Sequence, residues 1–574
     1  MKKVIIYFVV LSCSTNSLVS QATKAVLDKI PQESVYLHTN TNLIFAGEYL
    51  YYQFYCLLPE TKKLSNISTI GYVDLIDQNK TTVFQHKLRL TDGTASSEFF
   101  LPADIPSGNY KLIGYTNWMR SFGPTTFYKK DLTIINPYMG DQKVFLKDST
   151  QSNPTNKKRG LSQISTAPFD IRIGKSLFEN REEVELSIVS KSGSKLNGTY
   201  SLSVRKKAEI KTIDNEGMEY AITPVQQRTN PVSYDHLPET KGPFISGIVE
   251  MEPNASKSGQ KLMISLPGDN SVFKIATTDT TGAFKTQLEH TATRETMLLR
   301  TLDATEETQK VQLDTNRIVD YGEIDFYNFR LSEEMKDYIL ERSIHNQIEN
   351  AYFGNRPDSI LQPEPIKPFY DGQVATYDLD DYTRFSTLKE TIIEILDHVW
   401  IDENSEGKLE FKVRYFYPLQ DSGDRPLVFL DGAYIHDHEK LLSLPSKSIK
   451  TIKVGRDQYL YGSHVFQGII DISTFEGNSF EAYLDTNTQV ISFDQPRIKK
   501  NYYKEDYAEA MRDTKKRLPD FRSQLLWLPE IRPNASSFSI NFYTSDVSGE
   551  FEIILEGVSN LGVPISITES FTVK

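Results

Sequence analysis

Apolar and polar residues alternate along much of the chain, and this pattern predicts β-strands. Val184, Leu186 and Ile188, for example, alternate with polar neighbours. A period of two residues places one face of a strand in a core and the other in water. Turn residues such as Asp92-Gly93 separate the apolar runs at regular intervals, as in β-sandwiches. We therefore expect a mainly β fold, a string of immunoglobulin-like β-sandwiches with a small α+β domain.

The first sandwich is expected over residues 31–138. An apolar run that ends in Gly-Glu, Ile44 to Glu48, leads one strand of this segment. A Leu-Pro…Pro-x-Gly-x-Tyr pattern, Leu101 to Tyr110, leads another. Both motifs resemble those of macroglobulin-type domains, and the resemblance covers about a hundred residues. It implies a macroglobulin-like β-sandwich.

A linker rich in Ser, Asn, Lys and Gln occupies residues 148–167, and the strand pattern then starts again. Phe178 and Glu182 repeat the four-residue spacing of the first motif. Arg181 stands where the glycine of that motif would be, which is a departure from the family pattern. Residues 168–241 nevertheless resemble a second macroglobulin-like β-sandwich.

Residues 244–314 are expected to form another sandwich. Its hairpin at residues 278–284 contains Gly282, which can supply the positive φ of a turn. The segment resembles the carboxypeptidase-regulatory-like sandwich, and because peptidase chemistry in that family belongs to a different domain, the resemblance implies no catalysis. Residues 325–385 read as a helical connector, in which Ser332 is a good helix N-cap.

Residues 386–480 contain two apolar strands with characteristic turns. The first strand ends in Asp431-Gly432, a dipeptide suited to a tight turn, and Tyr461-Gly462-Ser463 precedes the second strand, which contains Gly468. A helical pattern that begins at Ser386 precedes both strands. This arrangement resembles the plug domain of TonB-dependent outer-membrane receptors, and the resemblance implies a small α+β plug-like domain. Its structural motif consists of Asp431, Gly432, Tyr461, Gly462 and Gly468.

A receptor plug is normally enclosed by a barrel of about 22 strands, each about 9–11 residues long. The hundred residues after Thr474 are too few for such a barrel. Residues 481–574 are instead expected to form a C-terminal β-sandwich, because Phe538 and Ile540 belong to another alternating run. We expect this sandwich, which contains Trp527, to cover the apolar strands of the plug-like domain.

Residues 1–21 have the features of an export signal. Two lysines precede an apolar run of eight residues, too short for a membrane-spanning helix of about 20 residues. Two processing routes are open. In the first, Cys13 is lipidated; the tetrapeptide that ends at Cys13 resembles a lipoprotein box. In the second, a signal peptidase cleaves near Ser20 to Ala22 and removes Cys13 with the signal. Cys56 is the other cysteine, so no internal disulfide is expected.

The formal net charge of -12 argues against a nucleic-acid partner, which requires clustered Lys and Arg. The run His436-Asp437-His438-Glu439 could offer metal ligands, but a polar loop is the simpler interpretation because no third, distant ligand is identifiable. The sequence contains no nucleophile elbow, His-Glu-x-x-His motif or phosphate-binding glycine loop. It also lacks the Cys-Gly-Glu-Gln thioester of trapping macroglobulins. We expect no catalytic residues, no metal and no cofactor.

Together these features predict a non-enzymatic envelope protein of the outer membrane, an adaptor subunit of a complex for transport or biogenesis. Its expected partners are other envelope proteins, for example a β-barrel complex. A lipid on Cys13 would hold it to either face of the membrane; a soluble periplasmic location is the alternative. Edge strands of sandwiches accept a partner's strand. The candidate contact loop, Ala433 to Leu442, includes Tyr434, His436, Asp437 and His438.

Two other functions stay open. A macroglobulin-like protease inhibitor without a thioester would need an exposed bait loop, for which residues 209–241 are the candidate. The other alternative is an enzyme whose active site cannot be recognised in a single sequence.

Overall fold

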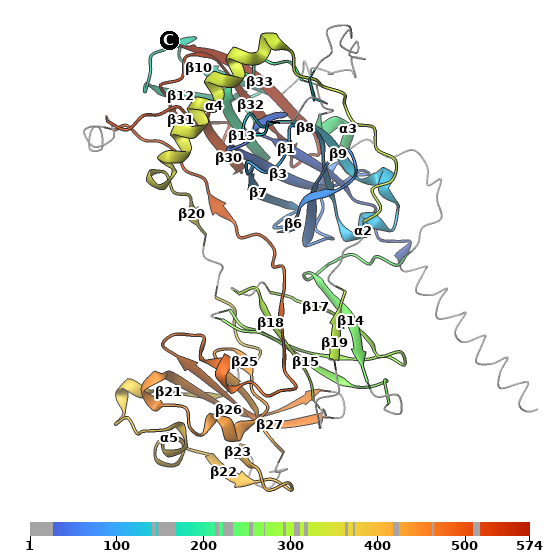
Figure 1. Cartoon of the computed structure of the whole chain (residues 1–574), viewed down its shortest axis with the longest axis vertical. Helices are drawn as coiled ribbons and strands as arrows, with labels where there is room; N and C mark the ends of the chain where they lie inside the picture. The colour runs from blue at the N-terminus through green and yellow to red at the C-terminus, as the bar shows by residue number, and fades with distance from the viewer. Residues whose placement is uncertain are drawn as a thin grey trace, which may run out of the picture. The chain divides into compact units, whose positions relative to one another are not determined.

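The computed structural model describes residues 27–574 apart from 141–144, 147–167, 213–216, 222–233, 252–255, 269, 291–293, 303–309, 315–318, 362–364, 371–372, 417–423, 462–463 and 509–516. The chain forms two compact units, which are described separately (Figure 1). Unit 1 comprises Met1–Thr240, Val319–Leu361 and Pro496–Lys574, and unit 2 comprises Lys241–Ile318 and Gln362–Gln495. Strands predominate in both units, so the expected mainly β fold is confirmed. Within the described ranges, no helix is long and apolar enough to cross a membrane.

The first sandwich of unit 1 consists of two packed sheets. One sheet contains β1 (Ser34–Thr39), β3 (Tyr49–Leu58), β4 (Lys63–Leu64) and β7 (Thr94–Phe100). The other has the strand order β2 (Leu43–Phe45), β9 (Tyr128–Ile135), β8 (Gly108–Tyr115), β5 (Ile70–Ile76) and β6 (Thr82–Arg89). Large side chains from both sheets, among them Tyr36, Tyr55, Leu75 and Leu112, fill the core between them.

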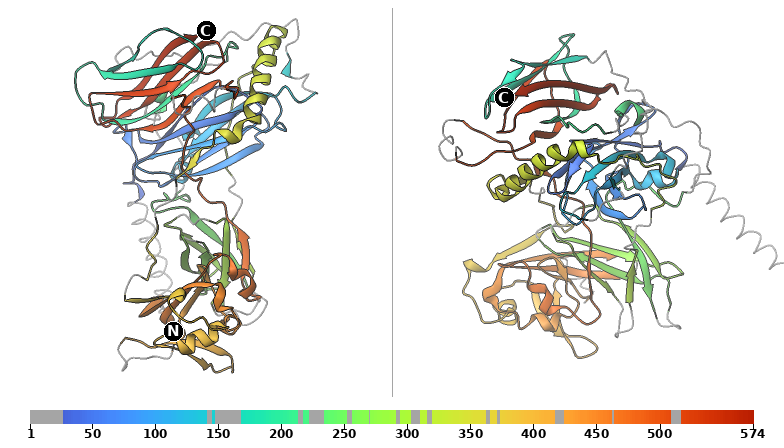
Figure 2. Two further views of the ribbon diagram at one scale, coloured as in Figure 1. Left: turned by 90° about the vertical axis from the view of Figure 1, so that its left-hand side faces the viewer. Right: turned by 45° about the horizontal axis from the view of Figure 1, so that its top comes forward.

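The second sandwich of unit 1 is built from two distant segments of the chain. Its first sheet has the order β10 (Phe169–Ile173), β12 (Glu183–Ser190) and β31 (Ser537–Tyr543). Its second sheet has the order β11 (Leu177–Phe178), β33 (Pro564–Val573), β32 (Gly549–Ser559), β13 (Gly198–Lys206) and β30 (Gln524–Ile531). Figure 2 shows the green early strands beside the red late strands in both views.

This arrangement corrects the expectation of two separate sandwiches at residues 168–241 and 481–574. Each segment supplies strands to both sheets, so neither can bury its apolar faces alone. Val184 and Leu202 from the early segment share one core with Phe542 from the late segment.

Apart from the short β4, which has no counterpart, the two sandwiches of unit 1 have the same strand order. In each, the short second strand runs parallel to the last strand, β2 beside β9 and β11 beside β33. The turn after that short strand is also alike. Glu48 Oε2 accepts a hydrogen bond from the Phe45 N–H at 3.2 Å, and Glu182 Oε2 accepts one from the Glu179 N–H at 2.8 Å. The second sandwich is therefore a copy of the first, interrupted between β13 and β30.

Arg181 keeps the backbone conformation of the glycine that it replaces. Gly47 has a φ of 90° in the first turn, and Arg181 has a φ of 56° in the second. This left-handed region is strained for a residue with a Cβ atom, at a cost of about 1–3 kcal/mol. The Arg181 guanidinium donates to both carboxylate oxygens of Asp546 at 2.6 Å, and this bidentate pair offsets the strain.

The expected helical connector is divided between the two units. Helix α4 (Lys336–Ala351) belongs to unit 1, and the chain enters unit 2 after Leu361. Shorter elements of unit 1 are α2 (Asn117–Arg120), α3 (Met218–Ala221) and the paired strands β20 (Ser359–Ile360) and β29 (Lys500–Asn501). A bidentate ion pair fixes α4 to the first sandwich, because Arg342 Nε and Nη2 donate to the two carboxylate oxygens of Glu48 at 2.7 and 2.8 Å.

Unit 2 contains a sandwich formed mostly by residues 244–314. One sheet has the order β17 (Ala283–Gln287), β14 (Phe244–Glu250) and β19 (Lys310–Leu313). The other has the order β16 (Val272–Thr277), β15 (Lys261–Leu266), β18 (Thr296–Thr301) and β28 (Gln489–Ser492). Strand β28 follows the plug-like segment in the chain and pairs with β18, so this sheet includes residues from both sides of that segment.

The plug-like segment of unit 2 forms a five-stranded sheet. Its order is β21 (Val374–Asp378), β26 (Ile449–Tyr461), β27 (His464–Thr474), β24 (Leu427–Leu430) and β25 (Ala433–Tyr434). The two-stranded ribbon β22 (Val399–Glu403) and β23 (Leu409–Val413) and helices α5 (Leu388–Glu394) and α6 (His438–Leu441) complete it. Helix α5 begins at Leu388, two residues after the predicted start at Ser386, because Thr387 is the N-cap and accepts from the Glu390 N–H while Glu390 accepts from the Ser386 N–H.

The prediction that the final sandwich covers the plug-like strands is wrong. Trp527 belongs to unit 1, whereas the strands at Leu427 and Ile469 belong to unit 2. These strands share an apolar cluster with Met263 and Phe273 of the neighbouring sandwich. An apolar face must be covered, but the alternation in the sequence does not specify which segment covers it.

Candidate functional site

Asp431 and Gly432 form the tight turn that their sequence predicts. They connect β24 to β25, where Leu430 pairs with Ala433, and their φ values are 50° and 81°. Two residues with positive φ form the hairpin turn that matches the twist of the strands. A Cβ atom on Gly432 would lie 2.2 Å from the Ser271 side chain, so glycine is also required for space.

The carboxylate of Asp431 connects this turn to the end of β27. It accepts hydrogen bonds from the N–H and hydroxyl of Thr474 at 2.7 and 2.8 Å, and from the Ser479 N–H at 2.9 Å. Asp431 is buried, and its oxygens are occupied by these donors. Its position in the structure is that of a structural residue and not of a free acid or base.

The other residues of the plug-like motif also occupy structural positions. Tyr461 ends β26 and pairs with His464 of β27. Gly468 has a φ of 86°, and a Cβ atom there would lie 2.6 Å from the Val413 side chain. Gly462 lies outside the described residues.

The candidate contact loop is less accessible than expected. Tyr434 and His438 are 3% and 1% exposed, so these two side chains are not available to a partner. The Tyr434 N–H donates to Ser265 Oγ at 3.2 Å, and the His438 ring stacks on Phe411 at 5.1 Å. His436 and Asp437 are half-buried. The segment looked polar in the sequence, but it folds against two neighbouring elements.

Arg425 determines the electrostatics of the two histidines. Its guanidinium lies 3.2 Å from His436 Nε2 and 3.3 Å from His438 Nε2. Burial and this adjacent cation lower the pKa of His436 to about 2 and hold the pKa of His438 well below its usual value. A guanidinium in this position disfavours a metal cation on the same imidazoles. Within the described ranges, no three His, Cys, Asp or Glu side chains are grouped as metal ligands.

Two other predicted features fall partly or wholly outside the described residues. Cys13 is one of them, and the segments 213–216 and 222–233 of the candidate bait loop are the other. Cys56 is buried in β3, and burial raises the pKa of its thiol, so it behaves as a small apolar residue.

Unit 2 contains a cavity of about 750 Å³ beside the Asp431-Gly432 turn. Its charged lining includes Lys274, Glu289, Lys453 and Asp471. Lys274 donates to Glu289 at 3.0 Å, and the Tyr370 hydroxyl donates to Asp471. Burial raises the pKa of the Asp471 carboxyl.

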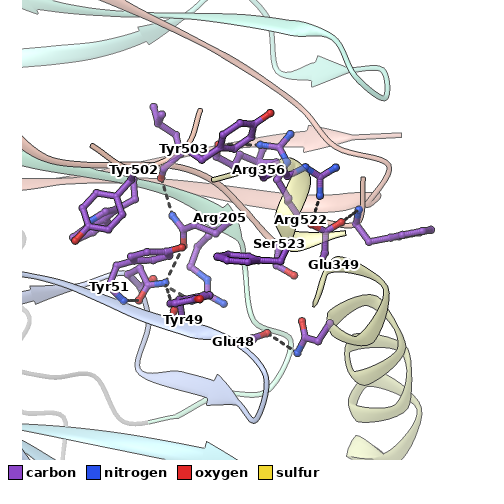
Figure 3. Close-up of a pocket in the computed structure, with 18 of the residues that line it drawn as sticks. Glu48, Tyr49, Tyr51, Arg205, Glu349, Arg356, Tyr502, Tyr503, Arg522 and Ser523 are labelled. Atoms are coloured by element: carbon purple, nitrogen blue, oxygen red, sulfur yellow. Dashed lines mark hydrogen bonds and ion pairs between the residues drawn. The ribbon is translucent and has the colours of Figure 1, made fainter. Parts of the chain in front are cut away.

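Unit 1 also contains a cavity lined by several aromatic rings, which we call the aromatic cavity (Figure 3). Its volume is about 160 Å³. Four of its rings form a continuous row, in which neighbouring centroids are 5.5, 5.8 and 6.0 Å apart and interplanar angles are 17–23°. In order along the row, these rings belong to Phe353, Tyr49, Tyr51 and Trp527. Tyr502 meets Tyr51 edge to face at 5.1 Å.

Ion pairs occupy most of the charged groups around the aromatic cavity. Glu48 accepts from Arg342 on both oxygens, from the Phe45 N–H and from Asn346 at 3.1 Å. Burial opposes its ionisation, but Arg342 outweighs burial and the pKa of Glu48 is lowered.

On the opposite side of the cavity, Arg356 donates to Glu505 at 3.1 Å, and Arg522 donates twice to Asp520 at 2.6 Å. The first pair connects two distant segments of the chain, and the four side chains are occupied by each other.

Sequence reasoning did not predict the aromatic cavity. Its walls come from β3, β13, α4, β30 and the segment around Tyr502, which are far apart in the chain. One local signal was available. Arg205 follows Thr199, Ser201 and Ser203 on the polar side of β13, where every residue from Gly198 to Arg205 is buried, and a charged residue in such a strand suggests an internal site.

Comparisons with known proteins do not assign the chain to a family. No family model and no curated protein matches it. Among solved structures, an α2-macroglobulin from Salmonella reacted with methylamine is similar, with 9% identity and a TM-score of 0.23 over 94% of this chain and 39% of that chain. An Escherichia coli α2-macroglobulin activated by porcine elastase is similar at 8% identity, with a TM-score of 0.24, over 94% and 44%. Latent dimeric PorU from Porphyromonas gingivalis has 10% identity and a TM-score of 0.16 over 49% and 33%.

The chain thus spans less than half the length of the α2-macroglobulins with which it was compared. These structures are built from macroglobulin-like domains, but TM-scores at this level support no inference about function. The resemblance to plug and carboxypeptidase-regulatory-like domains rests on the sequence motifs alone.

Proposed function

We propose that this chain is a non-enzymatic, exported protein of the outer membrane that acts as an interaction subunit of an envelope protein complex. The observation that carries the proposal is an open sheet edge in the plug-like part of unit 2. An extended segment of another envelope protein would add to this edge as a further strand.

Strand β21 forms this open edge. Val374–Asp378 pairs with β26 on one side, and no described strand pairs with its other side. Ala375 and Thr376 are exposed. An edge strand presents unpaired N–H and C=O groups, which accept an added strand. The opposite edge of the sheet is the short β25, whose two residues are buried.

The remaining support is chemical and positional. The Asp431 carboxylate is occupied by structural contacts with Thr474 and Ser479. The plug-like motif suggests an outer-membrane setting, and the N-terminal export signal suggests the route to it.

Proline substitutions in β21 test the proposal. Successive N–H groups of a strand point to opposite edges of that strand. Of Ala375→Pro and Thr376→Pro, one variant therefore removes a hydrogen bond to β26. The other, which we call the outward variant, removes an N–H donor from the open edge. We expect the outward variant to keep the thermal unfolding midpoint of the parent protein but to lose its partner. The measurement is photocrosslinking in cells from a reactive group at Asp378, with Lys389 as the control position. Identical adducts from the outward variant and the parent would contradict strand addition.

Anchoring is tested by Cys13→Ala. If Cys13 carries a lipid, the variant should move almost completely from the membrane fraction to the soluble fraction, because a covalent acyl chain contributes about 0.8 kcal/mol per buried methylene. It should also lose labelling by a fatty-acid analogue. A parent protein that takes up no label and fractionates as the variant does would favour cleavage near residue 20.

A further inference from the structure

Arg205 is a buried cation without an ion-pair partner in the aromatic cavity. It is 4% exposed and is among the lining side chains labelled in Figure 3. Its described hydrogen bonds go to backbone carbonyls, from Nη1 to Asn40 at 3.2 Å and from Nε to Lys206 at 3.4 Å. No described carboxylate lies within 4.0 Å of its guanidinium. Burial and the nearby Arg342 lower its pKa to about 10, although the more distant charges of Glu48 and Glu552 act in the opposite direction.

Glu48 does not neutralise Arg205 by direct contact. It lines the same cavity, but its two oxygens already accept four hydrogen bonds from Phe45, Arg342 and Asn346. A carboxylate offers about four acceptor positions, so these donors occupy it. A buried charge that is not paired is costly, and an anion in the cavity would reduce that cost.

Trp527 supplies a second donor without an acceptor. Its indole Nε1 is buried and has no hydrogen-bond partner among the described residues. The Trp527 side chain is 3% exposed and also lines the cavity. A guanidinium and an indole N–H are both donors only, so a ligand that satisfies them must present acceptor oxygens.

We propose that the aromatic cavity binds a monocarboxylate with an aromatic or aliphatic body. Arg205 and Trp527 donate to its carboxylate, and the row of rings from Phe353 to Trp527 contacts its apolar body. A single negative charge fits better than a phosphate dianion, because the other cations of the lining, Arg356 and Arg522, are already paired with carboxylates. This site is in unit 1, so the proposal does not depend on strand addition at β21.

The experiment measures binding of phenylacetate and of its uncharged analogue phenylacetamide to the purified full-length chain by calorimetry. Saturable binding of phenylacetate is expected, with phenylacetamide weaker by roughly tenfold to a hundredfold, the range for loss of a charge-assisted hydrogen bond. Equal affinity for the two compounds, or no saturable binding of phenylacetate, would overturn the proposal. Tighter binding of inorganic phosphate than of phenylacetate would overturn the assignment to a monocarboxylate.

Two substitutions locate the binding. Arg205→Met should abolish the preference for phenylacetate, whereas Arg172→Met, the same change at an exposed position on β10, should preserve it. Trp527→Phe keeps an aromatic ring and removes the indole N–H, so phenylacetate should bind several-fold more weakly. If Arg205→Met does not fold, Arg205→Lys keeps the charge without the planar fork and should weaken phenylacetate binding in a folded protein. Unchanged binding to Arg205→Lys and Trp527→Phe would contradict the site.

Discussion

Acidification from about pH 7.5 to about pH 5 is expected to destabilise both units, because their cores contain uncharged imidazoles. Burial lowers the pKa of His38 to about 4 and, together with Arg497, that of His86 to about 3 in unit 1. In unit 2, burial and Arg425 lower the pKa of His436 to about 2 and hold that of His438 well below its usual value.

The sign of the effect follows from proton binding. An unfolded histidine titrates near pH 6.5, whereas these folded imidazoles stay neutral down to about pH 4 or below. Between these values the unfolded chain binds more protons, so the free energy of unfolding falls as the pH falls. Each imidazole is expected to contribute a loss of about 2 kcal/mol by pH 5.

Hydrogen exchange followed by mass spectrometry would report the two units separately. His86→Gln should make unit 1 less sensitive to pH and leave the pH dependence of unit 2 unchanged, because Arg497 donates to His86 Nε2 at 2.8 Å within unit 1. His438→Gln should have the reverse effect, and the two variants serve as controls for each other. An unchanged pH dependence of unit 1 in His86→Gln would contradict a neutral, buried His86.

Local sequence features predicted the elements of the fold but not their partners. The alternating run at Val184 identified β12, and the Asp431-Gly432 pair identified a hairpin turn, because both depend on neighbouring residues. The pairing of β13 with β30 joins residues such as Leu202 and Leu528, which lie in distant parts of the chain. A strand with one apolar face fits any sheet of suitable length, so its pattern does not identify the strand beside it.

The two candidate sites also show that local sequence patterns do not reveal contacts between distant segments. The plug-like motif was visible because its residues are close in sequence, yet its loop was expected to be exposed, and His438 is buried against Phe411. The aromatic cavity combines Tyr51 of β3, Arg205 of β13 and Trp527 of β30. No spacing within one segment indicates that these side chains meet. Their meeting depends on the assembly of the second sandwich from two segments.

Loss of the Arg342 guanidinium is expected to be among the most destabilising single changes in unit 1. Arg342 is 5% exposed, donates to both oxygens of Glu48 and lies over the Phe45 ring at 4.5 Å. Arg342→Met keeps much of the side-chain volume but leaves Glu48 as a buried carboxylate without its cation. Removing one partner of such a pair costs about 3–5 kcal/mol.

The measurement is the free energy of unfolding of unit 1 in a denaturant titration, with hydrogen exchange in α4 as the local readout. Exchange in α4 should increase most, because Arg342 fixes this helix to the turn that contains Glu48. Glu341→Gln is the matched control on the same helix. It removes a 3.6 Å pair with Lys206 in which Glu341 is 55% exposed, and such surface pairs contribute about 1 kcal/mol or less.

A second substitution separates the ion pair from the packing of the side chain. Glu48→Leu combined with Arg342→Met removes both charges, so the double variant should be more stable than Arg342→Met alone although it lacks one more polar group. Two results would show that the unpaired Glu48 carboxylate is not the source of the destabilisation. One is that Arg342→Met lowers the free energy of unfolding no more than Glu341→Gln does. The other is that the double variant is less stable than either single variant. The expected order instead makes the Gly-Glu motif of the first sandwich an electrostatic anchor for α4, the helix that forms one wall of the aromatic cavity.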